Sequence, residues 1–228
     1  MRLSMIRDFL AGLALGVLAA VSAWAADDAE SGLASPFFAF DNGTGREQHV
    51  PLEEQAKMLK ELGYSGIGYT GTQQIPEMLK ALDAQGLKMF SVYVGADVDR
   101  GKSPYDPGLK TAIRQLKGRD TLIWVYILGG RPSSTESDDR AVTILREIAD
   151  MAEGAGLRVA LYPHAGFYVA RVEDSVRLAK KVDRKNVGAT FNLCHFLKVD
   201  NEENLERRLA EAMPYLFAVS INGADGGD

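Results

Sequence analysis

Val187-Gly-Ala-Thr-Phe-Asn-Leu-Cys-His195 predicts a buried β-strand that ends in side chains able to hydrogen-bond, ligate a metal or move a proton. A second stretch, Arg158-Val-Ala-Leu-Tyr-Pro-His164, repeats the pattern. Two of the three histidines of the chain therefore follow strand-like apolar runs. Ligands of α/β proteins bind at the carboxyl ends of the strands, so we expect a functional site at these two strand ends.

Short apolar runs alternate with longer helical patterns along the whole chain, which is typical of a parallel sheet covered by helices. Seven strands are expected, at 37–40, 66–70, 88–94, 122–128, 158–162, 187–192 and 216–221. Six helices are expected between them, at 52–62, 74–85, 109–116, 138–155, 172–182 and 202–212. Near-identical steps about 30 residues long favour a (β/α)8 TIM barrel over a doubly wound sheet.

An eight-stranded barrel needs one more strand than this sequence predicts. The chain ends at Asp228, directly after the seventh expected strand. Either the barrel domain is truncated at its C-terminus, or the sheet stays open at one edge and exposes unpaired backbone and apolar surface; the exposure favours truncation. We therefore expect an incomplete TIM barrel of the α/β class, with about seven strands and the last βα unit missing.

Residues 1–25 have the features of a secretory signal peptide. Arg2 and Arg7 precede an apolar stretch that is shorter than the roughly 20 residues needed to span a bilayer, and Ala23-Trp-Ala25 has the small-x-small pattern of a cleavage site. An uncleaved N-terminal anchor is the alternative. We expect cleavage after Ala25 and export to the periplasm or the medium, without stable membrane insertion. The remaining 203 residues, 26–228, then form one barrel domain.

The composition favours a small-molecule partner. The chain has a formal net charge of −5 and no run of lysines and arginines, so nucleic acid is not an expected partner. Cys194 is the single cysteine, which excludes an internal disulfide. Its thiol, at the end of an apolar strand, is more typical of a packed residue than of a reactive one. The oligomeric state is not indicated.

Hydroxyl, amide and carboxylate groups gather at the expected strand ends, which suits a carbohydrate. Sugars present many hydroxyls to pair and flat faces that stack on aromatic rings. The candidate substrate-binding residues are Tyr69, Tyr126, Tyr162, Asn192, Asn222 and Asp225. For any single tyrosine, packing at the barrel rim with the hydroxyl in water is the alternative interpretation.

His164 and His195 are the candidate catalytic residues. A neutral imidazole can bind a divalent metal or act as a general base near neutral pH. A lone histidine is more often a satisfied hydrogen-bonding residue, but two histidines on successive strand ends favour a role in a site.

The chain resembles the xylose isomerase-like TIM barrels, the sugar phosphate isomerase/epimerase superfamily that also includes endonuclease IV. The resemblance spans about Phe37 to Asp225, and its specific part is Ala160-Leu-Tyr-Pro-His164 together with residues 186–195. Members typically end the fifth strand in a Glu-x-His-like pattern and the sixth in an Asp-x-x-His-like pattern. The resemblance implies a divalent metal, such as Mn²⁺, Mg²⁺ or Zn²⁺, held by acidic residues and histidine. It also implies an acid/base pair that moves a proton between adjacent sugar carbons.

This chain departs from the family pattern where the metal ligands are expected. Tyr162 stands in place of the fifth-strand glutamate and Asn192 in place of the sixth-strand aspartate, while His164 and His195 match. The seventh strand ends in Ser220-Ile-Asn-Gly-Ala-Asp225, where relatives often place a histidine, and a glutamate of an eighth strand has no counterpart. Neutral groups thus replace the anions that hold a hard cation, and the metal is left unassigned.

Three functions are compatible with the sequence. The first is an exported sugar or sugar-phosphate isomerase or epimerase, in which His164 is the base and His195 with Asn192 orients the substrate carbonyl. The second is a non-catalytic carbohydrate-binding barrel that has lost the metal site. A nuclease like endonuclease IV is the third and is disfavoured, because it needs several anionic metal ligands and a basic track for DNA.

Overall fold

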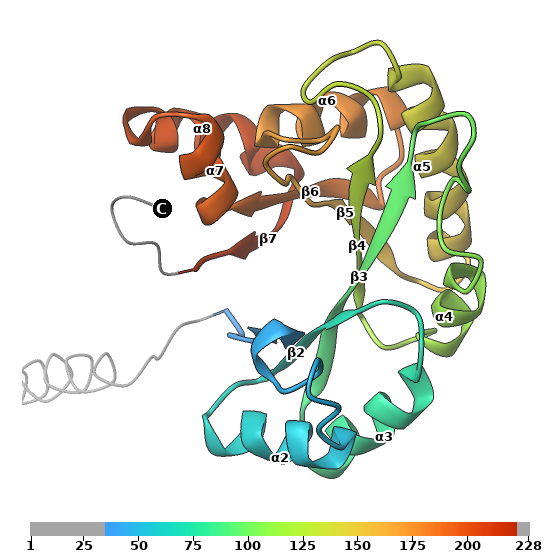
Figure 1. Ribbon diagram of the computed structural model, residues 1–228, viewed down its shortest axis with the longest axis vertical. Coiled ribbons are helices and arrows are strands. Elements are labelled where there is room, and N and C mark those ends of the chain that lie inside the picture. Colours follow the sequence, from blue (N-terminus) through green and yellow to red (C-terminus); the bar gives the residue numbers. More distant parts are fainter. Residues whose placement is uncertain (1–34, 223–228) are drawn as a thin grey trace, which may run out of the picture. The chain divides into compact units, whose positions relative to one another are not determined.

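Seven parallel strands form one sheet in the computed structural model, which describes residues 35–222. The expected signal peptide and Asp225 lie outside the described residues. All helices and strands named below belong to one of two compact units of the chain, Phe38–Asp228. The strands follow one another in sequence order (Figure 1). They are β1 (Ala39–Phe40), β2 (Gly66–Thr70), β3 (Lys88–Asp97), β4 (Leu122–Leu128), β5 (Arg158–Leu161), β6 (Val187–Asn192) and β7 (Leu216–Ser220).

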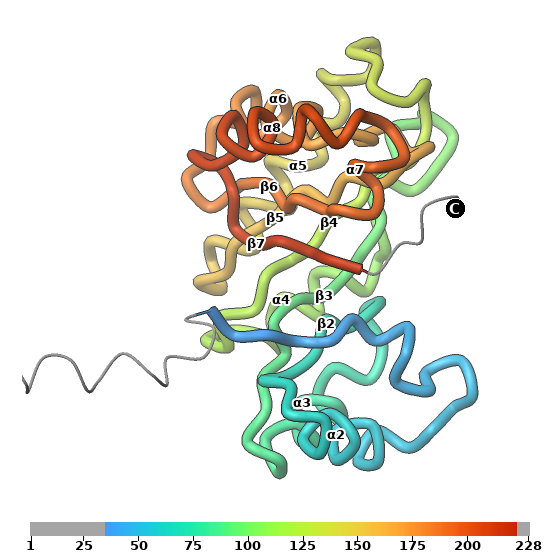
Figure 2. The backbone as a smooth tube through the Cα atoms, turned by 90° about the vertical axis from the view of Figure 1, so that its left-hand side faces the viewer, coloured from blue at the N-terminus to red at the C-terminus, as the bar shows by residue number. Residues whose placement is uncertain are grey.

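Helices connect successive strands and lie in an arc around the outer face of the sheet (Figures 1 and 2). They are α2 (Leu52–Glu61), α3 (Ile75–Ala84), α4 (Leu109–Gln115), α5 (Asp138–Glu153), α6 (Val172–Val182), α7 (Leu193–Val199) and α8 (Leu205–Ala212). Three short 3-10 helices, Asp41–Gly43, Glu202–Asn204 and Met213–Tyr215, complete the described connections. This is a TIM-barrel arrangement, as the alternating pattern predicts.

Alternation of side chains along each strand separates two apolar layers. One layer, with Ile67, Val92 and Val125, is buried between the sheet and the helices. The other lies on the inner, concave face of the sheet, where Leu122, Trp124, Ala160 and Tyr162 form a buried cluster. Aromatic rings from the two outermost strand regions pack against that cluster, namely Phe38, Phe40 and Phe217. The inner layer therefore joins the two ends of the sheet through its side chains.

The barrel is incomplete, as expected. Strands β1 and β7 are the two ends of the seven-stranded order, and no strand of residues 35–222 pairs with the free edge of either. No helix in this described range is long and apolar enough to cross a membrane.

The predicted elements are confirmed, with one helix missed. Both bounds of β2, β4, β6 and α6 agree with the prediction, whereas β3 runs three residues further, to Asp97. The expected helix at 202–212 is a 3-10 turn followed by α8. Helix α7 was not predicted. It begins directly after β6, so Cys194 lies in a helix and not at the end of a strand, and its side chain is only partly buried.

Candidate functional site

The chain continues past β5 in an extended form that carries Tyr162 and then turns sharply at His164. The Tyr162 backbone N–H donates to the Val125 carbonyl at 2.9 Å, which extends the pairing of β5 with β4. The His164 N–H donates to the Val169 carbonyl at 2.9 Å, and the Phe167 N–H donates to the His164 carbonyl at 3.0 Å. These bonds close a tight turn that holds the His164 ring at the carboxyl end of the sheet.

Asn192 places the second histidine. Its side-chain oxygen accepts the His195 backbone N–H at 2.9 Å and thereby caps the N-terminus of α7. This turn folds the His195 ring back over the strand end, and the centroids of the His164 and His195 rings are 3.8 Å apart with an angle of 41° between their planes. The two histidines predicted from neighbouring strands are thus brought into direct contact.

His195 is held in the neutral form at neutral pH. Burial of the ring, followed by the positive charges of His164 and Lys198, lowers its pKa to about 4. Its Nδ1 atom is buried and has no hydrogen-bond partner among the described residues. The His164 Nδ1 atom lies 2.9 Å from the Ala165 carbonyl oxygen. Two imidazoles in such close contact cannot easily carry two charges, so one ring stays neutral when the other is protonated.

Six aromatic side chains form a closed circle of ring contacts at the carboxyl ends of β3, β4 and β5 and the start of α7, here called the aromatic circle. Successive centroids are 4.5, 5.6, 3.9, 3.8, 6.2 and 5.0 Å apart. In that order, starting and ending at Tyr93, the rings are Tyr93, Tyr126, Phe167, His164, His195 and Tyr162. Gly95 permits one of these contacts, because a Cβ there would lie 2.8 Å from the Tyr126 hydroxyl.

Tyr162, Asn192 and Ser220 form a second group on the inner face, here called the neutral triad. The Asn192 amide nitrogen donates a short hydrogen bond to the Tyr162 hydroxyl and lies 3.4 Å from the Ser220 hydroxyl. Burial raises the pKa of Tyr162, and hydrogen bonds from Ser220 and Asn192 oppose that rise. Asn192 is 1% exposed and Tyr162 is 8% exposed, so this hydrogen bonding takes place in a nearly dry environment.

The neutral triad does not fit the divalent metal that the family resemblance implies. Its phenol, amide and hydroxyl carry no negative charge, and both ends of the amide are already hydrogen-bonded. Within residues 35–222 no group of three or more histidine, cysteine, aspartate or glutamate side chains is arranged to hold a metal ion. We therefore assign no metal-dependent reaction step to the described residues.

A cavity of about 350 Å³ lies beside the aromatic circle, at the carboxyl ends of β2, β3 and β4. Tyr93 and Tyr126 of the circle line it, together with the carboxylates of Asp97 and Asp106. No lysine or arginine is among the described residues that line it. Asp106 already accepts hydrogen bonds from the Thr72 hydroxyl at 2.7 Å and the Gly108 N–H at 2.7 Å. The cavity thus combines aromatic surface with hydrogen-bond acceptors.

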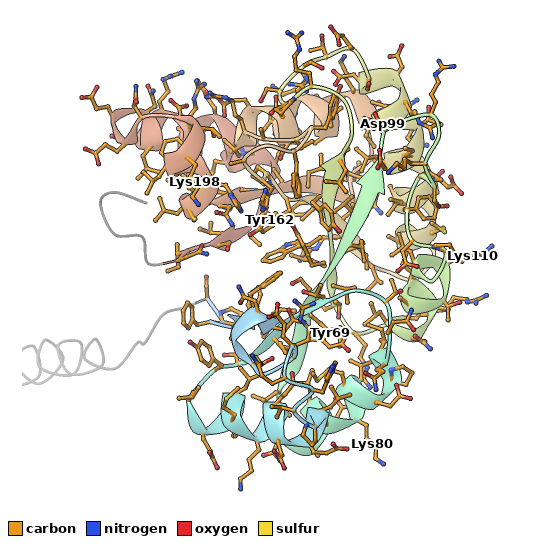
Figure 3. The ribbon with its side chains drawn as sticks, in the orientation of Figure 1. Tyr69, Lys80, Asp99, Lys110, Tyr162 and Lys198 are labelled. Atoms are coloured by element: carbon orange, nitrogen blue, oxygen red, sulfur yellow. The ribbon has the colours of Figure 1, made fainter. Side chains whose placement is uncertain are left out.

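The structure brings some of the candidate substrate-binding residues together and separates others. Tyr126, Tyr162 and Asn192 join the histidines, whereas Tyr69 faces the helices, where its hydroxyl donates to the Gln73 carbonyl at 3.1 Å. Burial raises the pKa of Tyr69. Figure 3 shows Tyr162 on the inner face of the sheet and Tyr69 apart from it, on β2 above α2 and α3. Asn222 is exposed after the end of β7.

Sequence reasoning did not include Asp97 or Phe167 in the site. Asp97 lies at the end of the unpredicted extension of β3, and the alternation of apolar residues up to Ala96 is a signal that could have revealed it. Phe167 stacks on His164 because of the turn after β5, for which the sequence carries no comparable signal.

Comparison with known proteins places this geometry in context. The family model described as "xylose isomerase-like TIM barrel" matches residues 70–228. No curated protein matches the sequence.

Solved structures with a similar fold include three bacterial proteins that share less than a fifth of their residues with this chain. The 3-keto-D-glucoside 4-epimerase of E. coli is 18% identical with a TM-score of 0.61, over 74% of this chain and 73% of that one. The D-psicose 3-epimerase of Clostridium cellulolyticum is 16% identical with a TM-score of 0.64, over 81% and 72%. The probable 3-DHS dehydratase of Bacillus anthracis is 15% identical with a TM-score of 0.67, over 81% and 72%. At these identities the likeness shows the fold.

Proposed function

The chain belongs to the xylose isomerase-like TIM barrel family, and on this premise we propose that it is a sugar isomerase or epimerase that moves a proton between carbons without a resident metal. The observation that carries the proposal is the close contact between the His164 and His195 rings inside the aromatic circle. The similar structures include two sugar epimerases, which supports this reaction class.

The histidine pair divides the acid/base work between its two rings. His164 is the proposed base, which removes the proton next to the sugar carbonyl and becomes an imidazolium. His195, whose pKa is lowered to about 4, stays neutral beside it and is proposed to orient the substrate by hydrogen bonding. The C–H electron pair forms the carbon–carbon double bond of an enediolate, and the carbonyl π pair moves to oxygen, which takes the negative charge. Return of the proton to the neighbouring carbon, with the hydroxyl proton of that carbon passing to the enediolate oxygen, gives isomerisation. Epimerisation requires protonation of the opposite face of the same carbon by a donor other than His164, such as water.

The cavity beside the aromatic circle favours an uncharged sugar over a sugar phosphate. Asp97 and Asp106 can accept hydrogen bonds from sugar hydroxyls, and Tyr93 and Tyr126 offer rings for stacking. A phosphate group would meet these carboxylates without a lysine or arginine from the described lining residues. We therefore expect at least tenfold weaker binding of the phosphate ester than of the corresponding free sugar.

A second function, carbohydrate binding without catalysis, is favoured by the neutral triad. Two of its side chains, Tyr162 and Asn192, stand where the family resemblance implies metal ligands, and Asn192 donates hydrogen bonds to Tyr162 and Ser220 instead. In this alternative the aromatic circle and the cavity bind the sugar, and the histidines serve only as hydrogen-bonding and stacking groups.

Proton transfer into deuterated solvent separates the two functions. The purified protein is incubated in D₂O with a panel of free ketoses and aldoses, and NMR follows both sugar binding and loss of the C–H signal next to the carbonyl. We expect solvent deuterium to enter that position, with a loss of at least 100-fold in rate for His164→Gln. Binding without deuterium exchange would support the binding-only function, and neither binding nor exchange would contradict both for those sugars.

We also propose export to the periplasm or the medium, on the pattern of residues 1–25. The N-terminus of the protein isolated from cell fractions can be determined by mass spectrometry. A chain that begins at Ala26 in the exported fraction is expected, and an intact Met1 in the cytoplasmic fraction alone would contradict it.

A further inference from the structure

We infer that the neutral triad takes over the place of a divalent cation and presents the phenolic O–H of Tyr162 to an oxygen atom of the ligand. The identity of that ligand as a sugar carbonyl or hydroxyl rests on the proposed function. The exclusion of the cation is independent of it and follows from the orientation of a single buried amide.

The orientation of the Asn192 amide is fixed by the backbone of α7. The His195 N–H is a donor, so the side-chain atom that it meets at 2.9 Å must be the oxygen. The amide nitrogen is therefore turned toward Tyr162 and Ser220. A cation placed among these three side chains would face the positive end of an N–H group, because the amide oxygen is already committed to the helix cap.

The same orientation leaves the Tyr162 proton available. The Tyr162 oxygen accepts from the Asn192 amide, which occupies one lone pair of the phenol. The Ser220 hydroxyl also interacts with the phenol and can serve as donor or acceptor; when it donates, the Tyr162 O–H is left for a ligand. A nearly buried hydroxyl in this state is a ready donor to a ligand oxygen.

The Tyr162 O–H can partly replace a cation as the group that stabilises negative charge on the ligand oxygen. During proton removal the carbonyl oxygen gains negative charge, and a hydrogen bond from Tyr162 strengthens as that charge develops. The phenol keeps its proton, and the hydrogen bond that its oxygen accepts from Asn192 makes it a better donor. Tyr162 is thus assigned to the electrophilic side of the site, while His164 serves as the base.

A metal-binding measurement tests the cation step without any sugar. Mn²⁺ is titrated into the purified protein and followed by calorimetry and by the Mn²⁺ electron paramagnetic resonance signal. We expect no stoichiometric binding up to millimolar Mn²⁺. One tightly bound Mn²⁺ per chain in the unmodified protein would overturn the inference.

Asn192→Asp converts the amide into a carboxylate and keeps an oxygen to cap α7. It places a negative charge between the two hydroxyls, and we expect Mn²⁺ affinity to rise at least tenfold above that of the unmodified protein. Asn201→Asp is the matched control, because Asn201 is exposed and away from the triad. If the folded Asn192→Asp protein binds Mn²⁺ no more tightly than this control, the amide is not the group that excludes the cation.

Tyr162→Phe tests the donor step. It retains the ring and its stacking but removes the O–H, so we expect about tenfold weaker sugar binding, the loss of one good hydrogen bond. Ser220→Ala leaves the Tyr162 proton in place and should weaken binding less, with thermal unfolding recorded for both variants. Equal sugar binding by Tyr162→Phe and the unmodified protein would overturn the donor role. Absence of sugar binding by the unmodified protein would instead contradict the proposed function, while the Mn²⁺ result would still stand.

Discussion

The stability of the protein depends on pH through His195, whose ring is partly buried against His164. Its folded-state pKa is lowered to about 4 from 6.5, so the unfolded chain binds more protons between these two values. The stability contributed by the neutral ring is therefore fully present above pH 6.5 and is lost as the pH falls toward 4. Because the ring is partly exposed, solvent screening limits the effect to about 1 kcal/mol.

We expect the Cε1–H resonance of His195 to titrate near pH 4 in a proton NMR experiment, clearly below the ordinary histidine value of 6.5. His195→Gln identifies the resonance and should flatten the dependence of urea-unfolding free energy on pH between 7 and 5. Titration of His195 near pH 6.5 would show that the ring is not packed against His164 as described.

Helices α5 and α6 hold the loops of the site through buried charges at their N-terminal ends. Arg177 of α6 donates to Asp138 of α5 at 3.1 Å and makes a short hydrogen bond to Asp174. Tyr168, from the turn that carries His164, donates to the other oxygen of Asp138 at 2.7 Å. Burial alone would raise the pKa of Asp138, but hydrogen bonds from Lys181, Tyr168 and Arg177 lower it.

Arg177→Met should destabilise the protein by about 3 kcal/mol, since it leaves two almost fully buried carboxylates without their shared cation. Arg184→Met is the matched control, because it breaks an exposed pair with Asp150 and should cost less than about 1 kcal/mol. Urea unfolding at pH 7 measures both. Equal effects would mean that the Asp138 and Asp174 carboxylates are solvated or otherwise paired.

The sequence predicts elements better than it predicts contacts between them. Apolar periodicity is sufficient to predict the strands and most helices. Helix α7 was missed because its apolar residues continue those of β6 without a break, although Asn192 is a good N-cap residue and could have signalled it. Tyr69 lies with Ile67 on the helix-facing side of β2, and period-two alternation already predicts that side. The stacking of Phe167 on His164 depends on a turn that no local pattern describes.

At the scale of the whole molecule, the two edges of the open sheet are the least supported parts of the fold. Strands β3, β4 and β5 have hydrogen-bonded neighbours on both sides, whereas β7 pairs with β6 alone among the described strands. The side chains of β7 are only partly buried, and Val219 is 51% exposed. Local opening is easiest where few buried contacts hold the backbone. The amide hydrogens of β7 should therefore exchange faster than those of β3, β4 and β5.

Hydrogen exchange followed by mass spectrometry should show the longest protection in peptides covering β4 and much faster exchange in peptides covering 216–220. Repeating the measurement over a hundredfold range of protein concentration supplies the control, because an edge that pairs with a second chain gains protection with concentration. Protection of β7 equal to that of β4 and independent of concentration would contradict the open edge, since its backbone groups would then need a partner within the same chain.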